Sequence, residues 1–185
     1  MEEKQKLPTD RSFPMYVLLD IITGHIYQAF MLSKMSKEIN IVAQDGKKTM
    51  NYMKLFLAMI GAGLLFALGF FVKSMIITKI TYVLLFALII FLFIWLFGIS
   101  DRIGKELKRR EVNYKFGAST FVTYFVVPLV AVYLIIIILK ICGLEENIAS
   151  ISGGVPAILT YVYFYKLITA MNCLNKAYNE KENLM

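Results

Sequence analysis

The chain has 185 residues, of which 58% are apolar and only 18% are charged, and its formal net charge is +7. A soluble domain carries charge on about a quarter of its residues. The composition therefore argues against a soluble globular protein and predicts an all-α integral membrane helical bundle. The length corresponds to one domain, which we place at residues 13–179, between a polar N-terminal tail at 1–12 and a C-terminal tail at 180–185.

Three long stretches of the sequence contain no charged residue: Leu55–Val72, Ile80–Gly98 and Phe121–Leu139. A helix needs roughly 20 mostly apolar residues to cross about 30 Å of hydrocarbon, and each stretch is close to that length. With a further apolar segment near the C-terminus, the sequence predicts four full spans. Their expected bounds are about 52–72, 80–98, 121–139 and 155–170.

An earlier apolar segment, about 13–32, is interrupted by polar residues such as Asp20 and Gln28. It either crosses the membrane fully, which we favour, or forms a shallow re-entrant hairpin broken at Thr23-Gly24. Non-helical backbone at membrane depth is tolerated only where protein or water covers it. The side of the membrane on which the N-terminal tail lies depends on this choice.

Lysine and arginine are distributed unevenly among the connections. Three regions that fall on one side of the predicted spans hold fourteen of them: 33–54, 101–116 and the chain from Lys166 onward. The links on the other side hold three: Lys73, Lys79 and Lys140. Basic connections stay in the cytoplasm, so the C-terminus is expected there, together with helices at about 33–42, 100–112 and 171–178.

The candidate functional residues of the first segment are Asp20, Thr23, Gly24 and Tyr27. On a continuous helix these four positions share one polar face, and an ionisable residue inside a membrane segment is a functional-site hypothesis. The alternative is turn chemistry, because Asp and Thr beside Gly are common turn residues. We expect His25 to point elsewhere.

Three further groups of residues have an expected role. Small residues inside the second segment should allow close helix packing: Ala58, Ala62, Gly63, Ala67 and Gly69. A basic cytoplasmic helix should attract anionic lipid headgroups rather than nucleic acid: Arg102, Lys105, Lys108, Arg109 and Arg110. Aromatic residues of the last span either anchor it at the interface or line a cavity: Tyr161, Tyr163 and Tyr165, followed by Lys166.

The sequence offers no set of metal or haem ligands, since it has one histidine and two cysteines. No glycine loop follows a strand to hold a phosphate, and only His25 could serve as the base of a hydrolytic triad. We therefore expect no cofactor, no metal and no enzymatic activity. An enzyme that uses Asp20 and His25 is the least favoured hypothesis.

The stretch YVLLDIITGHIYQAFMLSKMSKEINIVAQDGKKT, Tyr16–Thr49, resembles a bacterial membrane family, domain of unknown function 4234. The stretches Ile99–Phe121 and Ile168–Asn179 look similar to its downstream part, so the resemblance reaches from about 13 to 180. His25 and Gln28 depart from the family pattern, which usually has an apolar or small residue and a glycine there. The resemblance implies a multi-pass protein of a bacterial inner membrane and carries over no catalytic residue or ligand.

The sequence leads us to expect a non-enzymatic membrane protein that self-associates as a homo-oligomer and forms a small channel or pore. It has no soluble domain large enough for independent work, and the polar face at Asp20–Tyr27 needs burial against protein or water. The alternative is a membrane scaffold, sensor or immunity-type protein that acts by binding another protein.

Overall fold

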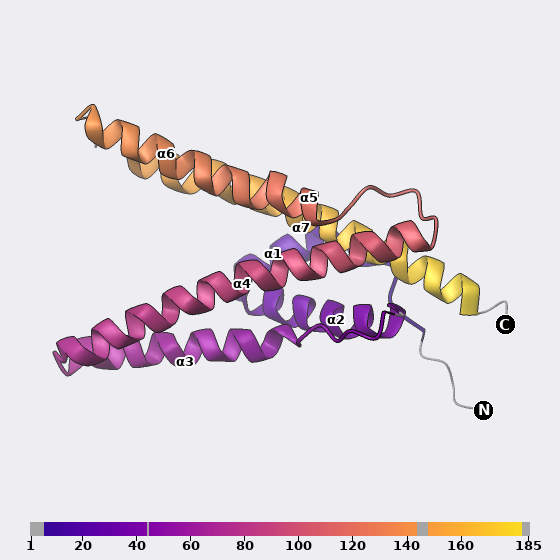
Figure 1. Cartoon of the computed structure of the whole chain (residues 1–185), viewed down its shortest axis with the longest axis horizontal. Helices are drawn as coiled ribbons and strands as arrows, with labels where there is room; N and C mark the ends of the chain where they lie inside the picture. The colour runs from indigo at the N-terminus through magenta and orange to yellow at the C-terminus, as the bar shows by residue number, and fades with distance from the viewer. Residues whose placement is uncertain (1–5, 44, 144–147, 183–185) are drawn as a thin grey trace. The chain divides into compact units, whose positions relative to one another are not determined.

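The structure, a computed structural model, describes residues 6–43, 45–143 and 148–182, with the backbone alone for 148–157 and 182. Helix accounts for 81% of the chain, and the described residues contain no strand. The all-α fold class is confirmed. The elements labelled in Figure 1 are α1 (Phe13–Ile22), α2 (Ile26–Val42), α3 (Tyr52–Phe71), α4 (Met75–Arg109), α5 (Ala118–Phe121), the π-helix η1 (Val122–Val126), α6 (Val127–Ile141) and α7 (Ile148–Glu182).

The chain divides into two compact units, and each is described by itself. The first unit is Leu18–Ile99, which holds α2, α3 and most of α4. The second unit combines Met1–Val17 with Ser100–Met185, and it holds α5, η1, α6 and α7. The single membrane domain expected from the sequence, residues 13–179, stays a prediction.

In the unit Leu18–Ile99, α3 and the apolar part of α4 form an antiparallel hairpin. Near the start of α3 the rings of Tyr52 and Trp95 lie 4.9 Å apart, and the Trp95 indole donates a hydrogen bond to the Met50 carbonyl at 2.8 Å. At the other end Gly69 lies against α4, where a Cβ would be only 2.9 Å from Ile77 Cγ2. The two helices therefore touch at both ends of the hairpin.

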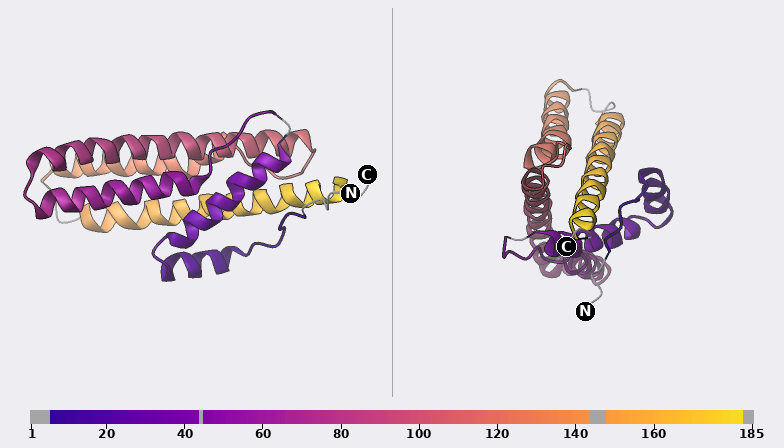
Figure 2. Two further views of the ribbon diagram at one scale, coloured as in Figure 1. Left: turned by 90° about the horizontal axis from the view of Figure 1, so that it is seen from below. Right: turned by 90° about the vertical axis from the view of Figure 1, so that its right-hand side faces the viewer.

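In the unit that contains Ser100–Met185, α5, η1 and α6 form one continuous helical stretch that runs beside α7 (Figures 1 and 2). Its π-helical turn, Val122–Val126, comes just before Pro128. Proline lacks the N–H of a regular helix and its ring clashes with the carbonyl four residues earlier. The wider turn, in which the Val127 N–H donates to the Val122 carbonyl, keeps the helix continuous there.

Three of the described helices are long and apolar enough to cross a membrane: Tyr52–Phe71, Met75–Arg109 and Ala118–Ile141. Only 17, 22 and 11% of their most apolar stretches are buried inside the chain. Soluble proteins rarely expose contiguous apolar surface of more than a few hundred Å², so the exposed apolar surface of these helices is compatible with a membrane protein. They coincide with three of the four predicted spans. The fourth, 155–170, lies within α7, partly outside the residues whose side chains are described.

The structure corrects the predicted bounds at three places. The segment 13–32 is not one helix, because Gly24 and His25 both have positive φ (57° and 68°) and end α1. The part of it after His25 belongs to α2, together with the predicted helix 33–42. The predicted helices 80–98 and 100–112 are joined in the single helix α4, which ends at Arg109 rather than at 112. Likewise 155–170 and 171–178 both lie in α7.

Candidate functional site

The candidate site is the turn between α1 and α2. The Gly24 N–H bonds to the Ile21 carbonyl at 3.4 Å and the His25 N–H to the Asp20 carbonyl at 3.0 Å. This pair of bonds, with a left-handed residue at Gly24, is the Schellman arrangement that ends many helices. It turns the chain sharply and leaves the side chains of Asp20 and His25 free to meet.

Asp20 and His25 form a side-chain pair at this turn. The His25 Nδ1 atom lies 2.8 Å from Asp20 Oδ2. The Asp20 side chain is only 2% exposed, whereas the His25 side chain is 68% exposed. The expectation that His25 points elsewhere is wrong, because it assumed a continuous helix.

Only one of the two carboxylate oxygens of Asp20 takes part in the pair with His25. Its Oδ1 atom is buried and has no hydrogen-bond partner among the residues that the structure describes. A buried polar atom without a partner costs about 1–3 kcal/mol, and more when it is charged. The site therefore favours an additional partner for Oδ1, such as a proton, a cation, water or a donor from another copy.

The remaining predicted members of the polar face have local roles. The Thr23 hydroxyl donates to the Leu19 carbonyl at 2.7 Å and accepts from the Tyr27 N–H at 3.0 Å. It thereby links the end of α1 to the first turn of α2. The four residues Asp20, Thr23, Gly24 and Tyr27 do not share one helix face as expected, because the chain reverses between them, although all belong to the same turn. Whether they have a functional role stays a prediction.

Along α2, the turn between α1 and α2 lies well away from the point where α2 contacts the start of α3. The Ser33 hydroxyl donates to Asn51 Oδ1 at 2.6 Å, and the same oxygen accepts from the Met53 N–H at 2.9 Å to cap α3. Ser33 is therefore level with the start of an apolar span. At 1.5 Å per residue, His25 lies about 12 Å further along the α2 axis.

The residues before α1 are tied to the second half of α7. We call residues 7–11 the strap, and one face of α7 holds it through Asn172, Asn175 and Asn179. The Leu7 N–H donates to Asn179 Oδ1 at 3.0 Å, and three amide groups donate to the carbonyls of Leu7, Pro8 and Arg11 at 2.8, 2.8 and 2.9 Å. The start of α1 is thus fixed beside the C-terminal half of α7.

The predicted packing residues of α3 separate into two groups. Ala62 and Gly69 are buried, and Gly69 allows the contact with α4 described above. Ala58 and Gly63 are exposed, Ala67 is half-buried, and a Cβ at Gly63 would meet no atom within 4 Å. The first group packs within the chain, and the second leaves part of α3 uncovered.

The predicted aromatic residues of the last span also separate. Tyr163 is fully buried, and its hydroxyl lies 2.8 Å from Ser100 Oγ. It packs among aromatic rings of the same unit: Phe116, Phe121, Phe125 and Phe164. A cavity-lining role for Tyr163 is therefore wrong. Tyr165 is half exposed and Lys166 lies over the Tyr124 ring at 5.2 Å, while Tyr161 is half-buried.

The described residues contain no group of three His, Cys, Asp or Glu side chains that could hold a metal ion. Sequence reasoning missed the Asp20–His25 pair and the strap. The turn residue Gly24 was a signal for the first, since glycine is the usual residue after the end of a helix. The three asparagines, spaced three and four residues apart, were a signal for the second.

The fold and these apolar helices define the class: a helical protein with several segments long enough to cross a membrane. Within that class, the chain belongs to the family described as Domain of unknown function (DUF4234), which it matches over residues 11–105. The match includes Tyr16–Thr49, reaches only the beginning of Ile99–Phe121, and does not extend to Ile168–Asn179. No curated protein and no solved structure matches the chain.

Proposed function

We propose that the chain is a non-enzymatic integral membrane protein that self-associates and forms a small channel whose polar wall is the α1–α2 hairpin. The observation that carries this proposal is the buried Asp20 carboxylate with its unpartnered Oδ1 atom. Carboxylates inside membrane segments are rare, face protein or water, and mark ion or proton pathways.

The helix lengths support a re-entrant hairpin, and with it four full spans. α1 has ten residues, which is about 15 Å, or half of the hydrocarbon thickness. The strap ties the start of α1 to the C-terminal half of α7. On this topology the spans are α3, the apolar part of α4, the stretch Ala118–Ile141 and α7. Both termini then lie on the same side, and the basic connections favour the cytoplasm of a bacterial inner membrane.

The uncovered apolar surface of α3, α4 and α6 supports self-association. One copy buries little of it, and its exposed small positions, Ala58 and Gly63, would let a second helix approach closely. Copies arranged around the α1–α2 hairpins would enclose Asp20 and His25. In that arrangement the exposed His25 ring faces the pathway and the buried Asp20 supplies the negative charge that selects cations.

The topology can be tested by thiol labelling with a membrane-impermeant maleimide. In intact cells the reagent should reach Cys142, which is exposed at the end of α6. A cysteine introduced into the strap by Thr9→Cys, in a Cys142→Ser/Cys173→Ser background, should react only after permeabilisation. Labelling of the strap from outside would contradict the re-entrant hairpin and favour a full crossing by residues 13–32.

The channel can be tested by cation flux into liposomes that contain the purified protein. The wild type should conduct, and Asp20→Asn should change the flux or its cation selectivity while the oligomer mass stays the same. Asp101→Asn is the matched control, since Asp101 pairs with Lys105 at the polar end of α4. Absence of flux from a wild-type oligomer would contradict the channel.

The alternative function, binding of another protein, has one observation in its favour. The three asparagines of α7 bind the strap through its backbone, and backbone recognition does not depend on which protein supplies the extended segment. Removal of the strap should then create a binding site for a synthetic peptide of residues 6–12. Absence of flux together with such binding would favour a scaffold or sensor.

A further inference from the structure

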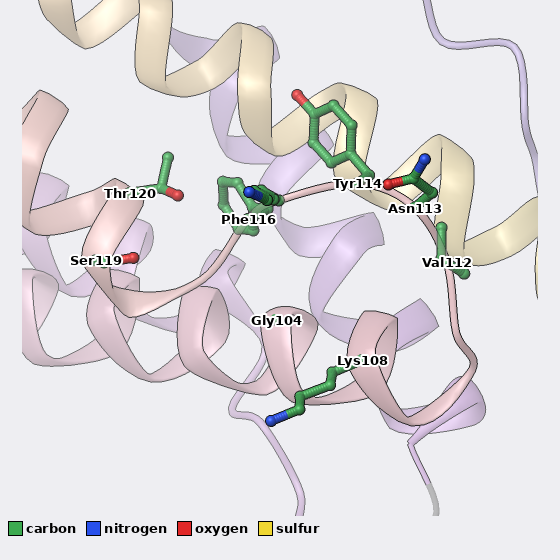
Figure 3. A pocket seen from close by; sticks show the side chains of 9 residues that line it. Gly104, Lys108, Val112, Asn113, Tyr114, Phe116, Ser119 and Thr120 are labelled. Atoms are coloured by element: carbon green, nitrogen blue, oxygen red, sulfur yellow. The ribbon is translucent and has the colours of Figure 1, made fainter.

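A pocket of about 380 Å³ lies between the end of α4 and the connection to α5. Figure 3 shows it from close by. Its floor is α4 around Gly104 and Lys108, one rim is the connection Val112–Phe116, and the other rim is the start of α5 with Ser119 and Thr120. All of these residues belong to the same unit.

The pocket owes its shape to a close crossing of the connection over α4. A Cβ at Gly104 would lie 2.6 Å from the Phe116 carbonyl oxygen and 2.8 Å from Gly117 Cα, so only glycine permits this approach. The connection is extended, and the exposure of its side chains alternates along the chain. Tyr114 and Phe116 are more buried, while Asn113 and Lys115 are exposed. The more buried side chains fix the connection, and the exposed ones remain available at the pocket.

Three of the predicted basic residues at the end of α4 have an acidic side chain within 4 Å. Lys105 pairs with Asp101 at 2.6 Å, and both Arg109 and Arg110 lie near Glu106, at 2.7 and 3.7 Å. Arg102 is buried. Asp101 and Glu106 therefore offset part of the positive charge of this group.

Lys108 and Lys115 differ from that group. Both are exposed, both line the pocket, and neither has an acidic partner among the residues that the structure describes. Around them the pocket offers neutral hydrogen-bond donors from Asn113, Ser119 and Thr120. Two ammonium groups with amide and hydroxyl donors, and no carboxylate in the lining, suit a phosphate group.

The position of the pocket along α4 suits a lipid phosphate. The apolar part of α4 ends at about Ile99, and Gly104 follows five residues later, which is about 7 Å along the helix. The polar headgroup layer extends about 5–7 Å beyond the hydrocarbon on each side of a bilayer. On the other rim, Ser119 and Thr120 come directly before the apolar stretch that starts at Phe121.

We propose that this pocket binds the phosphate group of an anionic phospholipid headgroup through Lys108 and Lys115, with Ser119 and Thr120 as further donors. The proposal rests on one part of the proposed function, namely that α4 and the stretch Ala118–Ile141 cross the membrane. It does not depend on ion conduction. It differs from general attraction of basic residues to an anionic surface, because it assigns binding to two lysines and excludes the paired ones.

The experiment is native mass spectrometry of the purified protein in a neutral detergent, titrated with phosphatidylglycerol and separately with phosphatidylcholine. The wild type should bind phosphatidylglycerol more tightly. Lys108→Gln/Lys115→Gln should weaken that binding roughly thirtyfold, since each of the two lysines near an anionic lipid contributes about 1 kcal/mol. These side chains are exposed, so helix content and melting temperature should not change.

The matched control is Lys34→Gln/Lys37→Gln, which removes two exposed lysines of α2 and the same net charge. It should keep the wild-type affinity within about twofold, because these residues lie outside the pocket. An equal loss in both double variants, or no loss in the pocket variant, would overturn the proposal.

Glycerol 3-phosphate distinguishes a lipid from a soluble phosphate as the source of the ligand. Weak binding of this compound, with tight binding of phosphatidylglycerol, supports the lipid. Binding as tight as that of the lipid, lost in Lys108→Gln/Lys115→Gln, keeps the phosphate pocket but overturns the lipid assignment. Failure of both compounds to bind overturns the pocket, whatever the liposome flux shows.

Discussion

The two helical hairpins, α1–α2 and α3–α4, close through the same local turn. In the first, Gly24 has φ 57° and the His25 N–H bonds to the Asp20 carbonyl; in the second, Lys73 has φ 53° and the Ser74 N–H bonds to the Gly69 carbonyl at 2.9 Å. What differs is the length of the helix that precedes each turn. α1 has 10 residues and α3 has 20, or about 15 and 30 Å.

This difference decides where each turn can lie. On the proposed topology a 30 Å helix carries its turn across the hydrocarbon. Phe71 and Met75, which flank the polar turn residues Lys73 and Ser74, are 81 and 70% exposed. On the same proposed topology a 15 Å helix ends halfway through the hydrocarbon, where polar backbone and side chains must be satisfied by protein. At the α1–α2 turn Asp20 is buried and pairs with the exposed His25. The same turn chemistry thus serves a plain connection in one hairpin and a candidate site in the other.

The largest expected effect is at the crossing that closes the α3–α4 hairpin. Gly69→Leu should lower the free energy of unfolding by about 3 kcal/mol, because overpacking of this size is costly and the new Cβ would lie 2.9 Å from Ile77 Cγ2 and 3.1 Å from the Thr78 backbone nitrogen. The measurement is unfolding in detergent followed by circular dichroism. Gly61→Leu, in the same helix, is the control and should cause no loss, since nothing lies within 4 Å of a Cβ there.

An intermediate effect is expected at the polar pair of the α1–α2 hairpin. His25→Leu should destabilise the protein by about 2 kcal/mol, because it removes the partner of a buried carboxylate. Asp20→Leu/His25→Leu should recover part of this loss, since both polar groups are then replaced by apolar ones. Thermal unfolding of the four proteins of this double-mutant cycle provides the test. A single His25→Leu variant as stable as the wild type would mean that the pair does not stabilise the turn.

The smallest effects concern the left-handed residue of each turn, and they should have opposite signs. Gly24→Ala should cost about 1 kcal/mol, because a side chain is disfavoured in the left-handed region. Lys73→Gly should gain up to about 1 kcal/mol, because it removes that penalty. Equilibrium unfolding of both variants in one detergent gives the comparison. Changes of the same sign would show that the two turns are not equivalent.

Much of the fold could be predicted from the sequence, and the reason is the bilayer length. Apolar stretches near 20 residues leave few alternatives to a spanning helix, so α3 and the apolar parts of α4 and of Ala118–Ile141 were placed within a few residues. For the segment 13–32 the sequence left two alternatives, one continuous helix, which we favoured, or a hairpin broken at Thr23-Gly24, and the structure has the break. The hydrophobic pattern of this segment alone could not distinguish a continuous helix from two helices joined at Gly24.

The sequence by itself determined the all-helical class, the family and the apolar spans, because hydropathy and length act locally along the chain. Only the tertiary structure decided that His25 meets Asp20, that the α7 asparagines hold the strap, and that Lys108 and Lys115 remain unpaired while Lys105 does not. Each of these facts depends on which residues a turn or a helix crossing brings within about 3 Å, the range in which hydrogen bonds and ion pairs act. Separation along the chain does not specify that distance.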